Sequence, residues 1–315
     1  MKLITSMDEI KEPFLNAVVT IGNFDGVHLG HREIFNAVIQ KAGAINGTSV
    51  AITFEPHPMK VLKKTSPPPL ITLFEQKSEL IKSTGIDVLV RIPFSKSFAA
   101  VTAHEFVCGI LLAKIGMKAI VVGKDYTFGK NRKGNIDFLK SYGNKYGFEI
   151  IVTDWIFNGK RPEDRVSSTR IRKSVQDGDV TEAEKMLGRP YQLRGAVTPG
   201  RNRGGRILGC PTANIKLTDE LCPKTGVYAV TVEVNAASEG KIYDGVANIG
   251  YSPTFEDHLF TVEVHILGFS GDLYDRPIRV NFHERIRSEK RFSSIEELSA
   301  QIKQDIRIAE RILAT

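Results

Sequence analysis

The first half of the chain alternates short apolar runs with longer stretches in which apolar positions recur with helical spacing. Such runs are typical of buried parallel strands, and the stretches between them suit crossover helices, including one predicted over His31–Ala44. The runs are AVVTI (17–21), TSVAITF (48–54), DVLVRI (87–92), KAIVVG (118–123) and FEIIVT (148–153). This pattern predicts a doubly wound α/β domain with a parallel sheet.

The pattern changes after the stretch TEAEKML, which ends at Leu187. Segments that alternate apolar and polar residues then follow one another without intervening helices, at 227–235, 241–250, 259–267 and 276–282. They predict an antiparallel sheet or barrel. We therefore expect two domains, residues 1–187 and residues 188–315.

An amphipathic stretch closes the chain, SSIEELSAQIKQDIRIAERIL. It predicts one C-terminal helix with Ser293 or Ser294 as N-cap, because a serine side chain can accept a hydrogen bond from the first turn. Glu296 or Glu297 lies at the spacing that completes a capping box.

The composition agrees with this architecture and indicates the cellular compartment. The 315 residues are 42% apolar and 25% charged, which is ordinary for a two-domain globular protein. Acidic residues interrupt the first twenty positions, where a signal peptide needs its apolar segment, and no apolar run is long enough to span a bilayer. We therefore expect a cytoplasmic protein.

The cysteines and the net charge say little about the function. Cys108, Cys210 and Cys222 are odd in number and form no CxxC pair, so neither a disulfide framework nor a cysteine zinc site is indicated. A net charge of +7 favours an anionic partner, but a nucleotide phosphate satisfies it as well as a nucleic acid. Charge alone does not decide between them.

The stretch GNFDGVHLGH, Gly22 to His31, joins the first predicted strand to the first predicted helix. Glycines there let a phosphate approach the backbone, and the helix N-terminus favours an anion. The motif is neither GxGxxG nor a P-loop; it offers His28 and His31 with Gly30 between them. Two other interpretations stay open at this point: histidines that only cap or pack, and a metal site with His57 as a third ligand.

Two further stretches carry candidate chemistry. VSSTRIR places Ser168, Thr169 and Arg172 on one face of a helix capped by Ser167 or Ser168, a phosphate-binding pattern that also suits a plain basic surface helix. EPHP (55–58) and KDYTFG (124–129) follow predicted strands, at the carboxyl edge where open α/β sheets bind ligands.

The second half offers a loop and a carboxylate. GRNRGGRILGCPTAN (200–214) is rich in glycine and arginine, which suits phosphate binding. Glu263 in VEVHIL could be a general base, or it could simply occupy the outward face of an alternating strand.

These motifs together resemble one family. GNFDGVHLGH is similar to the HxGH signature of adenylyl and cytidylyl transferases, and its GxFDGxHxGH form resembles the bacterial bifunctional riboflavin kinase/FAD synthetase family. TFEPHP, GKDYTFGKNRKG, VSSTRIR, GCPTANI, GVYAV, GVANIGYSPTF and VEVHIL follow in the family's order and cover nearly the whole chain. The resemblance implies an HxGH-type nucleotidyltransferase domain, then an antiparallel β-barrel riboflavin kinase domain with a C-terminal helix.

The resemblance also implies roles for individual residues. In the first domain, FMN and ATP would give FAD, with His28 and His31 as catalytic residues. The ATP-binding residues there would be Gly22, Phe24, Gly30, Ser168, Thr169 and Arg172. The flavin-binding residues would be Pro56, His57, Pro58 and Asp125.

In the second domain, riboflavin and ATP would give FMN, with Glu263 as the base. Thr212 and Asn214 would arrange Mg²⁺ or another divalent cation, and Gly204, Arg206 and Gly209 would bind ATP. The implied partners are small-molecule substrates, with no nucleic acid and no membrane.

The sequence departs from the family pattern at Pro199, Gly268 and Asp275. These departures leave open an enzyme that adenylylates FMN but has lost the kinase. A non-catalytic flavin or RNA binder is a third interpretation, supported only by the net charge; the presence of His28 and Glu263 argues against it.

Overall fold

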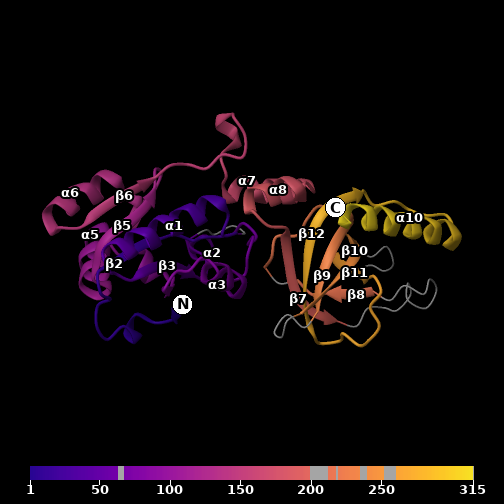
Figure 1. The fold of residues 1–315 in the computed structure, drawn as a ribbon, viewed down its shortest axis with the longest axis horizontal. Coiled ribbons are helices and arrows are strands. Elements are labelled where there is room, and N and C mark those ends of the chain that lie inside the picture. The colour runs from indigo at the N-terminus through magenta and orange to yellow at the C-terminus, as the bar shows by residue number, and fades with distance from the viewer. Residues whose placement is uncertain (63–66, 199–211, 218, 235–239, 252–259, 315) are drawn as a thin grey trace. The chain divides into compact units, whose positions relative to one another are not determined.

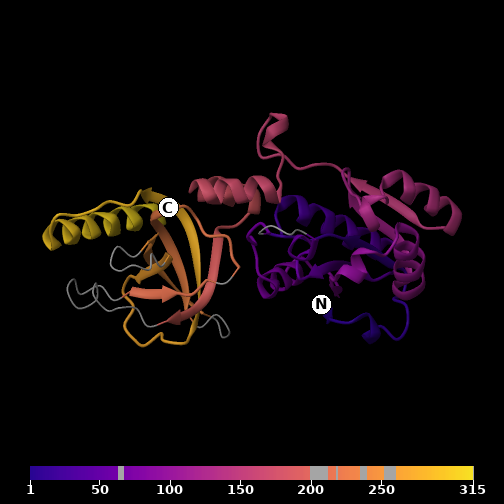
Figure 2. The same ribbon diagram turned by 180° about the vertical axis from the view of Figure 1, so that it is seen from behind.

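The computed structural model describes residues 1–62, 67–198, 212–217, 219–234, 240–251 and 260–314. The chain forms two compact units, Met1–Ser168 and Thr169–Thr315. Figures 1 and 2 show them from two sides, the first in indigo to magenta and the second in rose through orange to yellow. The predicted domain boundary between residues 187 and 188 stays a prediction.

The first unit is built on a six-stranded sheet with the order β1-β4-β3-β2-β5-β6. Its neighbouring strands are all parallel, which confirms the doubly wound prediction. Strands β3 and β5 flank the central strand β2, so the chain changes direction across the sheet at β2. The strands are β1 (Lys2–Ile4), β2 (Ala17–Ile21), β3 (Ser49–Glu55), β4 (Val88–Pro93), β5 (Met117–Gly123) and β6 (Glu149–Thr153).

Helices bury both faces of this sheet, because its central strands are apolar on both sides. On one face α1 (Leu29–Ala44) and α3 (Phe74–Lys82) pack against β2 through residues such as Phe35 and Ile81. On the other face η2 (Phe106–Ile115), a π-helix, and α6 (Ile136–Tyr146) contribute Leu111 and Leu139. The shorter helices are η1 (Met7–Glu9), α2 (Pro58–Leu62), α4 (Lys96–Ala99), α5 (Ala103–Glu105), η3 (Lys130–Arg132) and η4 (Pro162–Asp164).

The second unit is a closed barrel with the order β10-β11-β8-β7-β12-β9, preceded by α7 (Ser168–Asp177) and α8 (Val180–Leu187). All its strand pairs are antiparallel, as predicted. Alternate residues such as Val232 and Val280 are fully buried in its interior. The strands are β7 (Tyr191–Thr198), β8 (Thr212–Ile215), β9 (Gly226–Val234), β10 (Lys241–Tyr251), β11 (Phe260–Ile266) and β12 (Pro277–Arg287).

The C-terminal helix α10 (Ile295–Leu313) lies against the barrel strands β9 and β10. Ser294 is its N-cap and accepts from the backbone N–H of Glu297, which settles the choice between the two predicted serines. The Glu297 carboxylate accepts instead from the backbone N–H and hydroxyl of Ser293, at 3.1 and 2.8 Å.

Candidate active sites

The loop between β2 and α1 is held in a strained backbone conformation. Phe24 and Val27 have positive φ angles of 47° and 40°, and Gly26 lies between them at 87°. A left-handed backbone is costly for a non-glycine residue, and most costly for a β-branched one such as valine. Both side chains are buried, so core packing holds the loop in this shape.

A buried aspartate fastens this loop to the segment before α3. The Asp25 carboxylate accepts from the backbone N–H groups of Ile71 and Thr72, at 3.2 and 3.0 Å, and from the Thr72 hydroxyl at 3.3 Å. The same hydroxyl accepts from the backbone N–H of Gly26. Sequence reasoning assigned no role to Asp25, because its partners lie 46 and 47 residues away.

His28 and His31 lie together at the N-terminus of α1. The predicted helix start at His31 is two residues late, because the His28 ring caps the helix: its Nδ1 accepts from the backbone N–H of His31 at 3.3 Å. The two rings stack with centroids 3.6 Å apart and planes inclined by 15°. An Nδ1 that accepts a hydrogen bond leaves Nε2 as the protonated nitrogen, so His28 presents an Nε2–H donor.

The glycines of the motif make room for these rings. A Cβ on Gly30 would lie 3.2 and 3.3 Å from two atoms of the His28 ring, and one on Gly22 would lie 2.8 Å from the Phe24 ring. Phe24 in turn meets the His31 ring edge to face, with centroids 5.3 Å apart. Gly22, Phe24 and Gly30 thus shape the surroundings of the two imidazoles.

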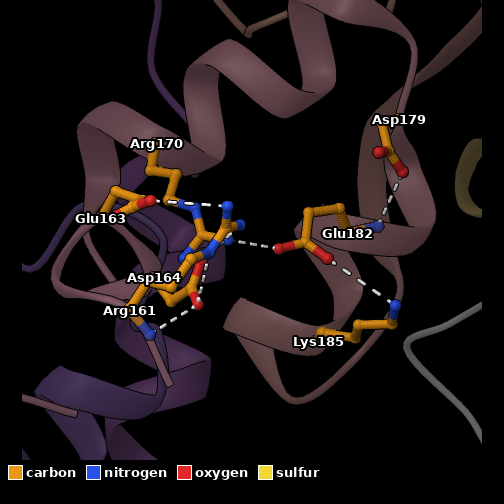
Figure 3. A network of polar contacts seen from close by, with 7 residues as sticks. All are labelled: Arg161, Glu163, Asp164, Arg170, Asp179, Glu182 and Lys185. Atoms are coloured by element: carbon orange, nitrogen blue, oxygen red, sulfur yellow. Dashed lines mark hydrogen bonds and ion pairs between the residues drawn. The ribbon is translucent and has the colours of Figure 1, made fainter. Parts of the chain in front are cut away.

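The VSSTRIR motif meets the loop through Ser168, the first residue of α7. Its hydroxyl donates to the backbone carbonyl of Asp25 at 2.9 Å. Thr169 and Arg172 follow in the same helix. The next helix steadies α7, since Glu182 of α8 accepts from Arg170 at 2.6 Å and also pairs with Lys185 (Figure 3).

The EPHP stretch lies at the carboxyl end of β3, as predicted. His57 is buried, and its Nδ1 accepts from the backbone N–H of Met59 at 3.2 Å. Pro56 is exposed and follows a cis peptide bond, and Pro58 begins α2.

Asp125 follows β5 at the same edge of the sheet and is bound by an arginine that sequence reasoning missed. The Arg165 guanidinium donates to the Asp125 carboxylate at 2.7 Å and stacks on the Trp155 ring at 4.3 Å. Arg165 returns to this edge because residues 157 and 165 form a β-bridge. In the segment between residues 157 and 165, the backbone N–H and the guanidinium of Arg161 donate to the Asp164 carboxylate (Figure 3).

Lys77 is a second residue that sequence reasoning missed. It lies on the inner face of α3 and is 2% exposed, so burial lowers its pKa from the usual 10.5. The carboxylates of Asp25 and Glu55 oppose this shift by stabilising the ammonium group. The positive charge of Lys77 therefore offsets the negative charges of Asp25, in the loop after β2, and Glu55, at the end of β3.

The barrel places Glu263 between two asparagines. Glu263 of β11 lies directly opposite Asn214 of β8 and Asn248 of β10. Its neighbours Val262 and Val264 are buried in the barrel, so alternation puts Glu263 on the outer wall. Partial burial raises the pKa of its carboxyl, which makes it a stronger proton acceptor once ionised. The role of Asn248 was not predicted, since only the strand register reveals it.

Thr212 lies two residues before Asn214 on β8, opposite His265 of β11. Residues at i and i+2 of a strand share a face, so Thr212 and Asn214 lie on the face of Glu263. The predicted phosphate-binding residues Gly204, Arg206 and Gly209, and the departure at Pro199, lie outside the described residues.

Two departures from the family pattern lie at positive φ angles. Gly268 has a φ of 66°, which glycine adopts without a Cβ penalty. Asp275 has a φ of 60°, and aspartate tolerates this region better than most residues do. Neither residue is a proposed catalytic group.

In the described part of the chain, no three histidine, cysteine, aspartate or glutamate side chains gather as a metal site. His28, His31 and His57 therefore do not form the zinc site that the sequence left open. Among the same residues, every helix is too short or too polar to cross a membrane.

Comparison with known proteins assigns both halves of the chain. A family model described as FAD synthetase matches residues 10–170, and one described as riboflavin kinase matches residues 187–313. The chain belongs to the bifunctional riboflavin kinase/FMN adenylyltransferase family. Both enzyme domains are present in one chain, as the motifs predicted.

Relatives in this family match over the full length. The bifunctional riboflavin kinase/FMN adenylyltransferase of Buchnera aphidicola is 37% identical, over 99% of this chain and 98% of its own. That of Escherichia coli K12 is also 37% identical, over 97% and 96%. A crystal structure from Streptococcus pneumoniae, described as a macrolide-efflux protein, has a TM-score of 0.87 at 33% identity, over 98% of this chain and 99% of its own. The same fold thus extends over the whole chain.

Proposed function

We propose that FMN is adenylylated at the carboxyl edge of the parallel sheet and that riboflavin is phosphorylated on the outer wall of the barrel. The observation that carries the first assignment is the stacked pair of His28 and His31 at the N-terminus of α1, where the sheet order reverses. Ligands of open α/β sheets bind at such a point, and helix N-termini favour phosphates.

Adenylylation needs alignment and charge stabilisation from the protein. An oxygen of the FMN phosphate attacks the α-phosphorus of ATP, the bond from that phosphorus to the β-phosphate oxygen breaks, and pyrophosphate leaves. In this proposal His28 Nε2–H and His31 donate to the phosphate that gains charge. Ser168, Thr169 and Arg172 hold the other ATP phosphates.

The loops after β3 and β5 would receive the flavin. Pro56, His57 and Pro58 lie on the first of these loops, and Asp125 lies on the second. Their common place at the carboxyl edge supports this assignment, because a ligand held by His28 lies at the same edge.

For the kinase, the 5′-hydroxyl oxygen of riboflavin attacks the γ-phosphorus of ATP, and ADP leaves. Glu263 accepts the proton of that hydroxyl during the attack. The oxygen donors of Thr212 and Asn214 suit a hard cation such as Mg²⁺. A cation held there would supply positive charge for the ATP phosphates. Gly204, Arg206 and Gly209 would hold those phosphates.

The product of the barrel is then the substrate of the parallel-sheet domain. We assign the adenylyltransferase to residues 1–187 and the kinase to residues 188–315. We further propose that the partners are small molecules alone, with no nucleic acid, and that the enzyme acts in the cytoplasm.

A product assay tests this function. The purified chain is incubated with ATP and Mg²⁺ and either riboflavin or FMN, and the flavins are separated by chromatography. We expect FMN and then FAD from riboflavin, and FAD directly from FMN. FAD from FMN without any FMN from riboflavin would leave a one-site enzyme, and no conversion of either flavin would overturn the proposal.

A further inference from the structure

We propose that the Ser168 hydroxyl oxygen is a ligand of the divalent cation that accompanies ATP in adenylylation. Ser168 would then hold the ATP phosphates through this cation and not by a direct hydrogen bond. The inference rests on the proposed adenylylation and deepens it. It assigns a metal ligand to a site where the family resemblance implies only contacts with ATP.

Ser168 lies beside the loop that carries the two stacked histidines. Its hydroxyl is 2.9 Å from the backbone carbonyl of Asp25, in the stretch that leads into His28. The segment before Ser168 also passes close to Gly30, because a Cβ on that glycine would lie 3.9 Å from the Val166 carbonyl oxygen. Two separate contacts thus bring the Ser168 oxygen to the proposed ATP site.

The carbonyl that Ser168 contacts is held firmly in place. Asp25 is 2% exposed, and its carboxylate accepts from the backbone N–H groups of Ile71 and Thr72. Its neighbour Gly26 donates from its backbone N–H to the Thr72 hydroxyl. The acceptor of the Ser168 hydroxyl is therefore fixed before any ligand binds.

The direction of this hydrogen bond follows from its two partners. A carbonyl oxygen has no proton to give, so the single proton of the Ser168 hydroxyl points to Asp25. The serine oxygen then offers only lone pairs to a ligand. Ionised phosphate oxygens also offer only lone pairs. A direct hydrogen bond from Ser168 to a phosphate would therefore require the bond to Asp25 to break.

A divalent cation satisfies the serine oxygen and the phosphate oxygens together. Mg²⁺ binds oxygen ligands, usually substrate phosphates and several waters beside one or two protein groups. In P-loop proteins a serine or threonine hydroxyl near the start of a helix binds Mg²⁺ while backbone N–H groups hold the phosphates. Ser168 is likewise the first residue of α7, and it is only partly buried, so a ligand can reach it.

Ser168→Cys in the full chain tests for the metal directly, because sulfur favours a softer metal such as Co²⁺ over Mg²⁺. With Co²⁺ and ATP and no flavin, we expect a thiolate-to-cobalt absorption band that the wild type lacks. In FMN adenylylation, the ratio of kcat/KM with Co²⁺ to kcat/KM with Mg²⁺ should rise about tenfold or more over the wild type. The same ratio for riboflavin phosphorylation should stay within about twofold.

Ser174→Cys is the matched control, because it puts the same thiol at a partly buried position of the same helix. It should give no band and should keep the wild-type ratio of rates. A folded Ser168→Cys protein without the band overturns the inference, whatever its rates, while the adenylylation proposal stands. If the wild type forms no FAD from FMN, both fail.

Ser168→Ala provides a second measurement in case the cysteine variant does not fold. In the presence of ATP, electron paramagnetic resonance of Mn²⁺ should show that one Mn²⁺ binds at least about tenfold more weakly than in the wild type, because a direct ligand is gone. Mn²⁺ binding equal to that of the wild type would overturn the inference.

Discussion

His28 serves two purposes with one imidazole ring. Its Nδ1 satisfies a backbone N–H at the start of α1, and that bond leaves Nε2 as the nitrogen that carries the proton. The ring cannot move far, because it stacks on His31 and lies over Gly30. We therefore expect the proposed site to depend on Gly30 as well as on the histidines.

Gly30→Ala tests this packing. The new Cβ would lie 3.2 Å from the His28 ring and must displace it by a few tenths of an ångström, so we expect kcat/KM for FMN adenylylation to fall about tenfold to a hundredfold. Riboflavin phosphorylation should stay within about twofold. Steady-state kinetics of both reactions on the same preparation provide the measurement.

Gly43→Ala is the matched control, because it lies in the same helix with nothing within 4 Å of its added Cβ. It should leave both activities unchanged and raise stability by about 0.5–1 kcal/mol. If Gly30→Ala behaves like Gly43→Ala, the steric account of the motif is wrong.

Lys77→Met should remove a pH dependence from the stability of the first unit. Burial holds the pKa of Lys77 below 10.5, so the unfolded chain binds this proton more tightly than the folded protein does. Between the lowered pKa and 10.5, the wild type should gain stability over the variant as pH rises, by up to about 1.4 kcal/mol per pH unit. Urea unfolding at several pH values, followed by the fluorescence of Trp155, the only tryptophan, measures this.

Lys82→Met, an exposed position of the same helix, serves as the control and should follow the wild-type pH dependence. If the free energy of unfolding changes with pH in the same way for Lys77→Met and the wild type, Lys77 has the same pKa in the folded and unfolded chain. The lowered pKa assigned to buried Lys77 would then be wrong.

At the scale of elements, periodicity predicted nearly all of the fold and local motifs predicted part of the sites. The five apolar runs of the first domain became β2 to β6, because a buried parallel strand has to be apolar on both faces. Strand β1 was missed, since only Ile4 of its three residues is buried. The π-helical winding of η2 leaves no period in the sequence that distinguishes it from an α-helix.

The residues missed at the sites share one physical cause. Asp25, Lys77 and Arg165 act through partners tens of residues away, and Asn248 faces Glu263 only because of the strand register. A local motif carries no information about such contacts. The two histidines were predictable because they lie within one turn of each other, and the helix that begins at Ser168 was predictable from the spacing of its own residues, although its contact with Asp25 was not.

The C-terminal helix α10 is anchored by one buried ion pair, which gives a stability prediction. The Arg287 guanidinium donates to the Asp305 carboxylate at 2.8 and 3.0 Å, and Asp305 is only 2% exposed. Asp305→Ala leaves the arginine without its partner and should destabilise the barrel unit by about 2–4 kcal/mol. Thermal inactivation of the kinase should come earlier, while the unfolding reported by Trp155 should not change.

Asp177→Ala is the matched control, because it removes an exposed i,i+4 pair with Lys173. Such pairs contribute little, so no change in kinase inactivation is expected. An Asp305→Ala variant as stable as this control would show that the pair does not anchor α10.

In the whole chain, two reactions belong to two architectures. A parallel sheet gathers loops and a helix N-terminus at one edge, which suits the alignment of two anions. An antiparallel barrel wall instead places a carboxylate beside amide and hydroxyl oxygens, which suits proton transfer from an alcohol. FMN is the product of one site and the substrate of the other, so both reactions can be followed in one preparation.

The central claim is that the two chemistries use separate residues, and reciprocal variants of the full chain test it most directly. His28→Asn with His31→Gln keeps a helix-capping side chain but removes both imidazoles, and Glu263→Gln keeps the shape but removes the proton acceptor. The account predicts at least about a hundredfold loss of FAD formation from FMN in the first variant, with riboflavin phosphorylation within about twofold. In the second it predicts about a 10²- to 10⁴-fold loss of riboflavin phosphorylation, with FMN adenylylation intact. Equal loss of both reactions in either folded variant would contradict it.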